Sequence, residues 1–505
     1  MPFSLSFLSA FPSRALRLGG PASLAGPTSL VGPASLVVLA TALAGCTVGP
    51  HYGGPPASAP VASARGDFLR ADRATTTPQA PSARWWEALG DPVLTGLIDK
   101  GLASSPDIAV ANARIAQARA GLAANKTSLL PTFNASTGVP YINVPADVLG
   151  SDKTGRTDTT IYNLGFDASW EFDLFGGTRR KIEAAGARAQ AAEAGLADAQ
   201  VTLSAEIARA YVSLRARQTV LASLDEQAGI DARLVDLARA RLQAGTAPEQ
   251  GLAQARGQAA RTEGDRATAR ADITVLIDQI AVLTGQEPGA LDGLLASPAP
   301  VPLPPASVSV GDPALLLRNR PDIRRAERDL AAANADIGAQ IAAGLPRVTF
   351  MGLLGLGGPN VGDAVDPDKV IGLAMPQLRW SAFDGGRNRA QVRNKRAAHA
   401  EAQASYQRTV LAALQDAESA LTRFGSQRQV LGKALDTQAQ ARRAQELQEQ
   451  RARAGTVALG DALTARRQAI AALQSSTSAQ AELVTDFIAV EKALGLGWQT
   501  TPAGA

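Results

Sequence analysis

The sequence predicts an α+β membrane protein in which β-strands lead directly into very long helices. From Ile161 to Phe175, apolar and polar residues alternate with a period of two, as in a strand with one aromatic and one acidic face. Gly176-Gly177 ends this pattern. More than sixty residues without proline follow, rich in Ala, Leu, Arg, Glu and Gln, which is typical of a single helix. A similar order of elements recurs about 210 residues later.

Two interpretations of this strand are open. In a membrane barrel, its aromatic side would face lipid and its acidic side would face a wet lumen. In a soluble sheet, it would be an edge strand with the acidic side in water. We favour the barrel, with a lipid face that holds Phe166, Trp170 and Phe172 and a lumen face that holds Asp167, Glu171 and Asp173.

Composition excludes several classes of protein. Aromatic residues make up only 4% of the chain and alanine is abundant, which favours closely packed helices over a broad globular core. The net charge is +4 and no basic patch is interleaved with aromatics, so nucleic acid is not an expected partner. The single cysteine excludes an internal disulfide and a cysteine-based metal cluster. No catalytic constellation, phosphate loop or metal motif is recognisable, so we expect no enzyme activity, no cofactor and no metal.

The N-terminus has the pattern of an export signal over residues 1–45. A short apolar run, Ser35 to Leu43, ends in the small residues Leu43-Ala44-Gly45-Cys46. This ending resembles the bacterial lipobox, which implies that Cys46 becomes the lipid-bearing N-terminus of the mature chain. An ordinary secretory signal with a chance cysteine is the alternative. After this segment no stretch is long and apolar enough to predict a transmembrane helix.

The mature chain begins with a tether and continues into a first repeat. Residues 46–84 are rich in Pro, Ala, Ser and Gly and lack periodicity, which predicts an extended tether. The first repeat covers residues 85–285 and starts with helices at Asp91-Pro92 and at Pro106. Two strands with a polar loop at 145–159 between them follow.

The long helix of the first repeat is expected from about Thr178 to about Ala244. At 1.5 Å per residue it would be roughly 100 Å long. Gly245 and Pro248 break it, and a partner helix returns to about Thr284. Residues 286–313 are proline-rich and form an expected linker.

The second repeat covers residues 314–496, and residues 497–505 form a tail. Its landmarks match those of the first repeat: Pro321-Asp322-Ile323 answers Pro106-Asp107-Ile108, and Gly385-Gly386 answers Gly176-Gly177. The agreement predicts an internal two-fold repeat.

Four strands per chain cannot close a barrel, because eight already leave an interior only wide enough for side chains. An open sheet in lipid would leave two edges of unpaired backbone groups. Three chains would supply twelve strands around a channel, so the pattern predicts a trimer with a twelve-stranded barrel.

The chain resembles the outer-membrane factors of tripartite efflux pumps, the TolC-like family, and within it the lipoprotein branch of the OprM and NodT type. Three matches carry the resemblance: Cys46-Thr47-Val48-Gly49-Pro50 with Tyr52, the run from Leu315 to Gly338 around Asn319-Arg320-Pro321-Asp322-Ile323, and Phe383-Asp384-Gly385-Gly386-Arg387.

The resemblance implies a homotrimer in the outer membrane with its helices in the periplasm. It also implies a periplasmic adaptor and an inner-membrane pump of the RND type as partners, beside membrane lipid. The expected function is a passive duct for small molecules such as drugs. The alternative is the outer-membrane duct of a type I protein secretion system.

The two helical tips carry the remaining expectation about function. They contain Gly245 in the first repeat and Arg451, Arg453, Gly455 and Asp461 in the second. In the family that the chain resembles, aspartates and arginines of this region hold the periplasmic end closed, which implies a gate role for Asp461 and the two arginines. A solvated helix face is the alternative, since exposed ion pairs contribute only ~0–1 kcal/mol.

Overall fold

The computed structural model describes residues 47–72, 74–145 and 155–498. The expected signal segment 1–45 and the expected lipid site Cys46 lie outside these ranges. Residues 47–498 belong to one compact unit.

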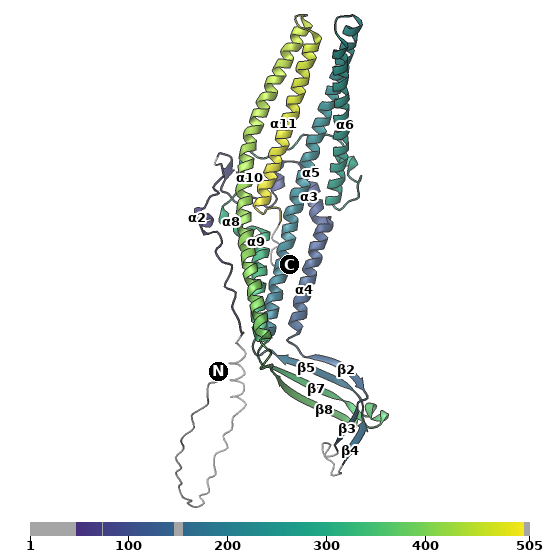
Figure 1. Cartoon of the computed structure of the whole chain (residues 1–505), viewed down its shortest axis with the longest axis vertical. Coiled ribbons are helices and arrows are strands. Elements are labelled where there is room, and N and C mark those ends of the chain that lie inside the picture. The colour runs from purple at the N-terminus through teal and green to yellow at the C-terminus, as the bar shows by residue number, and fades with distance from the viewer. Residues whose placement is uncertain (1–46, 73, 146–154, 499–505) are drawn as a thin grey trace, which may run out of the picture. The chain divides into compact units, whose positions relative to one another are not determined.

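Two long helical hairpins dominate this unit (Figure 1). In the first, α5 (Gly177–Gln243) has 67 residues and α6 (Glu249–Leu283) has 35. In the second, α10 (Arg387–Arg453) again has 67 residues and α11 (Leu459–Ala493) again has 35. The predicted bounds of the first long helix are correct to within one residue at each end. Glycines with positive φ, Gly245 at 70° and Gly455 at 73°, form the turn at each tip.

Each hairpin is continued by shorter helices that begin with proline. These are α3 (Pro92–Ser104) and α4 (Pro106–Thr127) in the first half and α8 (Pro313–Asn319) and α9 (Pro321–Ala342) in the second. Proline suits the first turn because its missing N–H has no partner there anyway. The side chain of Asp91 accepts hydrogen bonds from the backbone N–H groups of Val93 and Leu94, so it caps α3 as the sequence predicts.

The helices pack in a fixed order from one side to the other. α5 contacts α4 and α6 on one side and α9 and α11 on the other, and α9 and α11 also contact α10. The order is therefore α4 and α6, then α5, then α9 and α11, then α10. The largest buried side chains lie among these helices and in the short helix η1 (Trp85–Leu89); they include Trp86, Tyr211, Phe424 and Phe487.

One antiparallel sheet of four strands joins the helices. Its order is β2 (Thr132–Gly138), β5 (Tyr162–Phe172), β7 (Arg347–Gly358) and β8 (Val370–Arg379). A separate two-stranded ribbon, β3 (Tyr141–Pro145) with β4 (Arg156–Thr160), continues the first pair of strands. Strands β2 and β8 are the edges of the four-stranded sheet.

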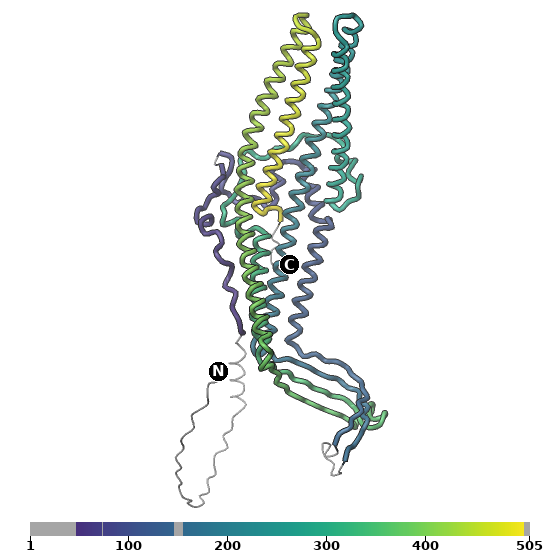
Figure 2. The backbone as a smooth tube through the Cα atoms, in the orientation of Figure 1, coloured from purple at the N-terminus to yellow at the C-terminus, as the bar shows by residue number. Residues whose placement is uncertain are grey.

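The chain passes directly from the strands of the sheet into the long helices, as Figure 2 shows. The predicted strand reaches Phe175, whereas β5 ends at Phe172. The carboxylate of Asp173 accepts hydrogen bonds from the backbone N–H groups of Thr178 (2.9 Å) and Arg179 (3.0 Å). These N–H groups have no partner within the first turn of α5. The expectation that Asp173 lines the acidic face of the strand is thus corrected, because this side chain caps the helix.

The predicted tether contains ordered elements. Residues 60–65 form a short helix, α2 (Pro60–Arg65), and β1 (Thr76–Thr77) pairs in parallel with β6 (Val308–Ser309) of the proline-rich linker. The linker also contains the helical turn α7 (Asp292–Leu295). Outside the linker, the short helix η3 (Val361–Val365) follows β7. The tether and the linker therefore hold each other against the middle of the long helices.

A buried carboxyl lies in the last turn of α11. Glu491 is only 4% exposed, and within the described part of the chain its Oε2 atom has no hydrogen-bond partner. Burial disfavours the charged form and raises the pKa of Glu491 to about 8. The carboxyl is therefore protonated in the folded protein at neutral pH.

We expect Glu491→Gln to remove a pH dependence of stability between pH 4.5 and 8. Below pH 4.5 the carboxyl is protonated in both states. As the pH rises towards 8 it ionises only in the unfolded chain, so the free energy of unfolding falls by roughly 3–5 kcal/mol. Thermal unfolding followed by circular dichroism from pH 4.5 to 9 measures this loss. The exposed Glu401→Gln is the control, and equal pH profiles for wild type and Glu491→Gln would contradict the assignment.

Candidate functional site

The two faces of the four-stranded sheet differ in chemistry. Phe166 of β5 is opposite Leu354 of β7, and both side chains are 62% exposed. The next residue, Asp167, points to the other face, where its carboxylate accepts a hydrogen bond from the Asn134 side chain of β2 at 3.0 Å. One face therefore presents large apolar groups to the surroundings. The other carries the polar groups of β2 and β5, together with apolar residues of β7 and β8 such as Met351 and Leu373.

The aromatic residues of β5 lie at different distances from the helices. The Trp170 ring stacks on Phe350 at 5.8 Å and meets Phe172 edge to face at 5.8 Å. Its indole N–H donates to the carbonyl of Leu129, just after the end of α4, at 2.9 Å. Trp170 and Phe172 are thus next to the helical end of the sheet, whereas Phe166 lies farther along the strand.

The junction between sheet and helices is built in the same way in both halves. Asp384 after β8 accepts hydrogen bonds from the backbone N–H groups of Gly386 (2.8 Å) and Asn388 (2.7 Å), as Asp173 does for α5. The cap fixes the direction in which each long helix leaves its strand. The direction of the helical wall is consequently set by the sheet.

The tips also share one construction. The backbone N–H and the hydroxyl of Thr246 both donate to the carbonyl of Arg241, and Thr456 makes the same pair of bonds to Arg451. These bonds satisfy carbonyls that the last turn of a helix leaves free. Gly245 and Gly455 lie in exposed turns at these positions.

The predicted gate residues are exposed and do not pair with one another within one chain. Arg453 is 79% exposed and pairs with Glu449 of its own helix at 3.6 Å. Asp461 lies in the first turn of α11, and among the residues described here neither it nor Arg451 has an ion pair. A gate role for Asp461 therefore requires a partner outside this chain.

A buried polar cluster that the sequence analysis did not single out joins the two hairpins near their tips. Asp231 of α5 is 1% exposed, lies 3.3 Å from the Arg467 guanidinium of α11, and accepts a hydrogen bond from the Thr262 hydroxyl of α6 at 2.6 Å. Ile230 packs against Leu463 beside it. No periodicity in the sequence marks this cluster, since its members come from three helices.

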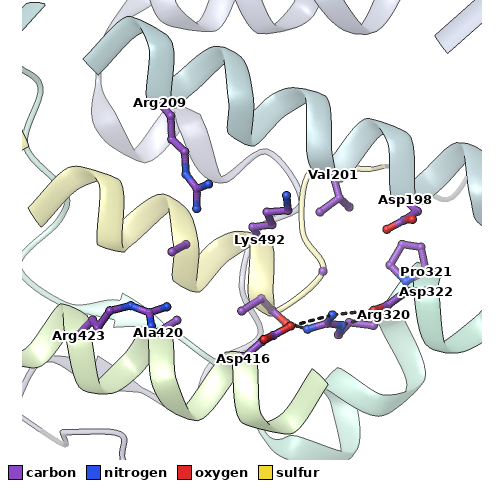
Figure 3. A pocket seen from close by; sticks show the side chains of 13 residues that line it. Asp198, Val201, Arg209, Arg320, Pro321, Asp322, Asp416, Ala420, Arg423 and Lys492 are labelled. Carbon is purple, nitrogen blue, oxygen red and sulfur yellow. Dashed lines mark hydrogen bonds and ion pairs between the residues drawn. The ribbon is translucent and has the colours of Figure 1, made fainter. Parts of the chain in front are cut away.

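A charged cavity of about 190 Å³ lies where α9 begins and α11 ends. Figure 3 shows Asp198 and Arg209 of α5, Asp416 and Arg423 of α10, and Lys492 of α11 around it. Burial and the neighbouring Asp322 raise the pKa of the Asp198 carboxyl. The cavity therefore contains charges of both signs, supplied by helices from both halves of the chain.

Arg320, from the motif that the sequence analysis singled out, connects the walls of this cavity. Its guanidinium donates to the carbonyl of Ala493 at 2.8 Å, pairs with Asp322 at 2.7 Å, and lies 3.6 Å from Asp416. It thereby ties the start of α9 to the end of α11 and to α10. The side chain is only 11% exposed, so these partners replace water almost completely.

The described ranges contain no group of three or more His, Cys, Asp or Glu residues placed to hold a metal ion. In the same ranges, none of the helices combines the length and the apolar composition needed to cross a membrane.

Comparison with known proteins gives consistent results. The profile of the family described as "Outer membrane efflux protein" matches residues 97–286 and 313–496. The pyoverdine export outer membrane protein OpmQ of Pseudomonas putida is 30% identical over 427 residues, which cover 83% of this chain and 89% of that protein. Nodulation protein T of Rhizobium leguminosarum bv. trifolii is 29% identical over 381 residues, covering 75% and 79%.

Solved structures agree with these matches. The outer-membrane channel OprN superposes with a TM-score of 0.81 at 31% identity, over 90% of this chain and 100% of that one. The open state of the Neisseria gonorrhoeae MtrE outer membrane channel superposes with a TM-score of 0.74 at 25% identity, over 90% and 98%.

We expect Arg320→Ala to lower the stability of the helical unit by roughly 3–5 kcal/mol, because it leaves the Asp322 carboxylate without its partner in a mostly buried site. Arg318→Ala, two residues away and exposed, is the matched control with an expected change within about 0.5 kcal/mol. Thermal unfolding of the detergent-solubilised variants measures both. Equal melting temperatures for the two variants would contradict a linking role for Arg320.

Proposed function

The chain belongs to the outer membrane efflux protein family, and from this premise we propose that three copies assemble into one passive duct through which small molecules leave the cell. The protein is an outer-membrane efflux channel whose helices lie in the periplasm. The proposal for assembly rests on one observation: in the described ranges of the chain, both edge strands of the four-stranded sheet, β2 and β8, have no neighbouring strand on their outer side.

In lipid, unpaired backbone groups cost several kcal/mol each, so these two edges need partners. The β8 edge of one copy can pair with the β2 edge of the next and so close a barrel. Two copies would give eight strands, which leave room only for side chains, whereas three give twelve and a channel. Cyclic symmetry is the simplest way to close such a ring.

The helical wall supports the same arrangement. Its free sides are α10 on one side and α4 with α6 on the other. Strand β2 follows α4 and β8 precedes α10, so each free edge of the sheet is next in the chain to a helix at a free side of the wall. A single rotation would therefore close the barrel and the helical tube together.

The chemistry of the sheet supports one orientation. Phe166, with Trp170 and Phe172 nearer the helices, faces lipid in this proposal, and Asp167 and Glu171 face the lumen. Rings of aromatic residues at the membrane–water boundary are typical of outer-membrane barrels, which fits the place of Trp170 beside the end of α4.

Anchoring and partners complete the proposal. Cys46 carries lipid in the outer membrane, as the lipobox-like ending at Gly45 suggests. A periplasmic adaptor and an inner-membrane pump of the RND type supply the energy, because a passive duct has none of its own. Relatives named for pyoverdine export and for toluene efflux favour small molecules over polypeptides as the cargo.

We expect Asp461→Ala to raise the conductance of the purified channel at least two-fold. In the proposed trimer the first turns of α11 surround one axis, so each Asp461 pairs with a cation of a neighbouring copy and the periplasmic end stays closed. Single-channel recording in planar bilayers measures the effect, with Asp436→Ala on exposed α10 surface as the control. A wild-type protein that forms no channel would refute the duct itself, whereas unchanged conductance of Asp461→Ala would refute only its gate role.

We expect Phe166→Arg to destabilise the assembled barrel by ~2–4 kcal/mol per chain, because an arginine would then face the hydrocarbon. Asp167→Arg at the same depth on the opposite face should be tolerated. Heat-modifiable oligomer bands after electrophoresis compare the two variants. If Asp167→Arg is the more damaging change, the two faces of the strand are assigned the wrong way round.

A further inference from the structure

The six residues that follow Cys46 in the sequence, 47–52, are held in a built site at the junction of sheet and helices. We call the residues that hold them the N-terminal seat: Phe175, Gly176, Arg180, Arg328, Asn334 and Gly338. Phe175 and Gly176 lie just before α5, Arg180 is in its first turn, and the other three members belong to α9. From the seat, the chain continues along the helices to α2 (purple in Figure 2).

Polar contacts hold the backbone of this segment at three successive residues. The N–H of Val48 donates to the carbonyl of Phe175 at 3.1 Å. The guanidinium of Arg180 donates to the carbonyls of Val48 at 3.2 Å and Gly49 at 3.4 Å, and the Asn334 amide donates to the carbonyl of Pro50 at 3.1 Å. The Arg180 side chain is only 3% exposed, and its guanidinium also pairs with Glu183 of the same helix at 2.8 Å, which holds it in place beside the segment.

Shape fixes the register of the segment. Gly49 has a φ of 93°, and a Cβ atom at this position would overlap the Cα of Gly338. A Cβ on Gly338 would in turn lie 2.8 Å from the Val48 carbonyl oxygen. Tyr52 then packs against three alanines of α5 and α9, and Arg328 lies over its ring at 5.9 Å. The segment can therefore not slide along its seat by a residue.

We propose that the N-terminal seat couples the lipid anchor to the junction, so that the lipid on Cys46 and the seat act as one attachment. Without the seat, the thirteen residues 47–59 before α2 could extend over roughly 45 Å, and the lipid would hold the fold only loosely. When residues 47–52 occupy the seat, the lipid-bearing Cys46 is only two residues from Val48, which is hydrogen-bonded to Phe175. The acyl chains then enter the bilayer where β5 passes into α5.

The coupling works in both directions. A lipid held in the bilayer keeps residues 47–52 at the depth of their seat and raises their effective concentration there. The seat in turn fixes the lipid next to the first turn of α5. The inference rests on the lipidation part of the proposed function, and it adds a role for Arg180, Asn334 and the Gly49–Gly338 contact.

Hydrogen exchange of the segment tests the coupling. The mature protein in phospholipid nanodiscs is analysed by mass spectrometry, first for acylation of Cys46 and then for exchange of the peptide that covers residues 47–55. We expect Arg180→Ala and Asn334→Ala each to speed exchange at least ten-fold. Arg188→Ala removes an exposed α5–α9 ion pair with Asp336 (2.7 Å) outside the seat, and it should leave the exchange unchanged.

A double-mutant cycle separates coupling from mere packing. The Cys46→Ser chain is exported with an ordinary cleavable signal in place of residues 1–45. It should exchange several-fold faster than the lipidated chain, and this difference should vanish when Arg180→Ala is present in both.

The outcomes are distinct. Equal exchange of lipidated and unlipidated chains, or equal effects of lipid with and without Arg180, would overturn the coupling. An unacylated Cys46 would overturn both the coupling and the proposed lipidation. Neither result would touch the duct, which is tested by the conductance of the wild-type channel.

Discussion

The unpaired edges of the four-stranded sheet impose the strongest constraint on this protein. Strands β2 and β8 each leave a row of backbone N–H and C=O groups open, and the bilayer offers no water to satisfy them. The helices next to the sheet are arranged in a way that fits its closure. The helices beside the two open strands, α4 with α6 and α10, are also the free sides of the helical wall. In the proposed assembly, the sheet and the wall are thus two parts of one surface that closes on further copies of the chain.

Rigid connections carry this constraint from the sheet to the tips. Asp173 and Asp384 cap the long helices at the point where each leaves its strand. Arg320 joins the start of α9 to the end of α11 in the middle of the wall. Asp231 and Arg467 join the two hairpins closer to the tips. Between these points many of the buried residues of α5 and α11 are alanines, so the helices lie close together.

Much of this arrangement could be predicted from the sequence because it depends on local rules. The ends of α5 follow from Gly177 and from the turn at Gly245, and the two faces of β5 follow from a period of two. The repeat fixes the second half once the first is known. Even the tips could be placed, since the Gly-Thr pairs have a local hydrogen-bonding function.

Other features could not be predicted, because the alternation of residues does not show them or because they depend on contacts between segments far apart in the sequence. Asp173 continues the alternation of β5 in the sequence, yet its carboxylate is used by the helix that follows. Trp170 has the same place in the pattern as Phe166, and the pattern does not show that its indole N–H bonds to the carbonyl of Leu129. Residues 47–52 show no periodicity from which their conformation could be predicted. Their conformation depends on Arg180 and Asn334, which are far away in the sequence. Asp461 has no ion pair among the described residues, so the partners that a gate would need could not be predicted from one chain.

Native mass spectrometry of the detergent-solubilised protein tests the central claim most directly, because closure of the two sheet edges requires a defined number of copies. The account predicts a single dominant species with three chains. This species should stay intact under the collisional activation that removes the detergent. A dominant monomer or dimer would contradict it, since neither four strands nor eight can enclose a wet channel.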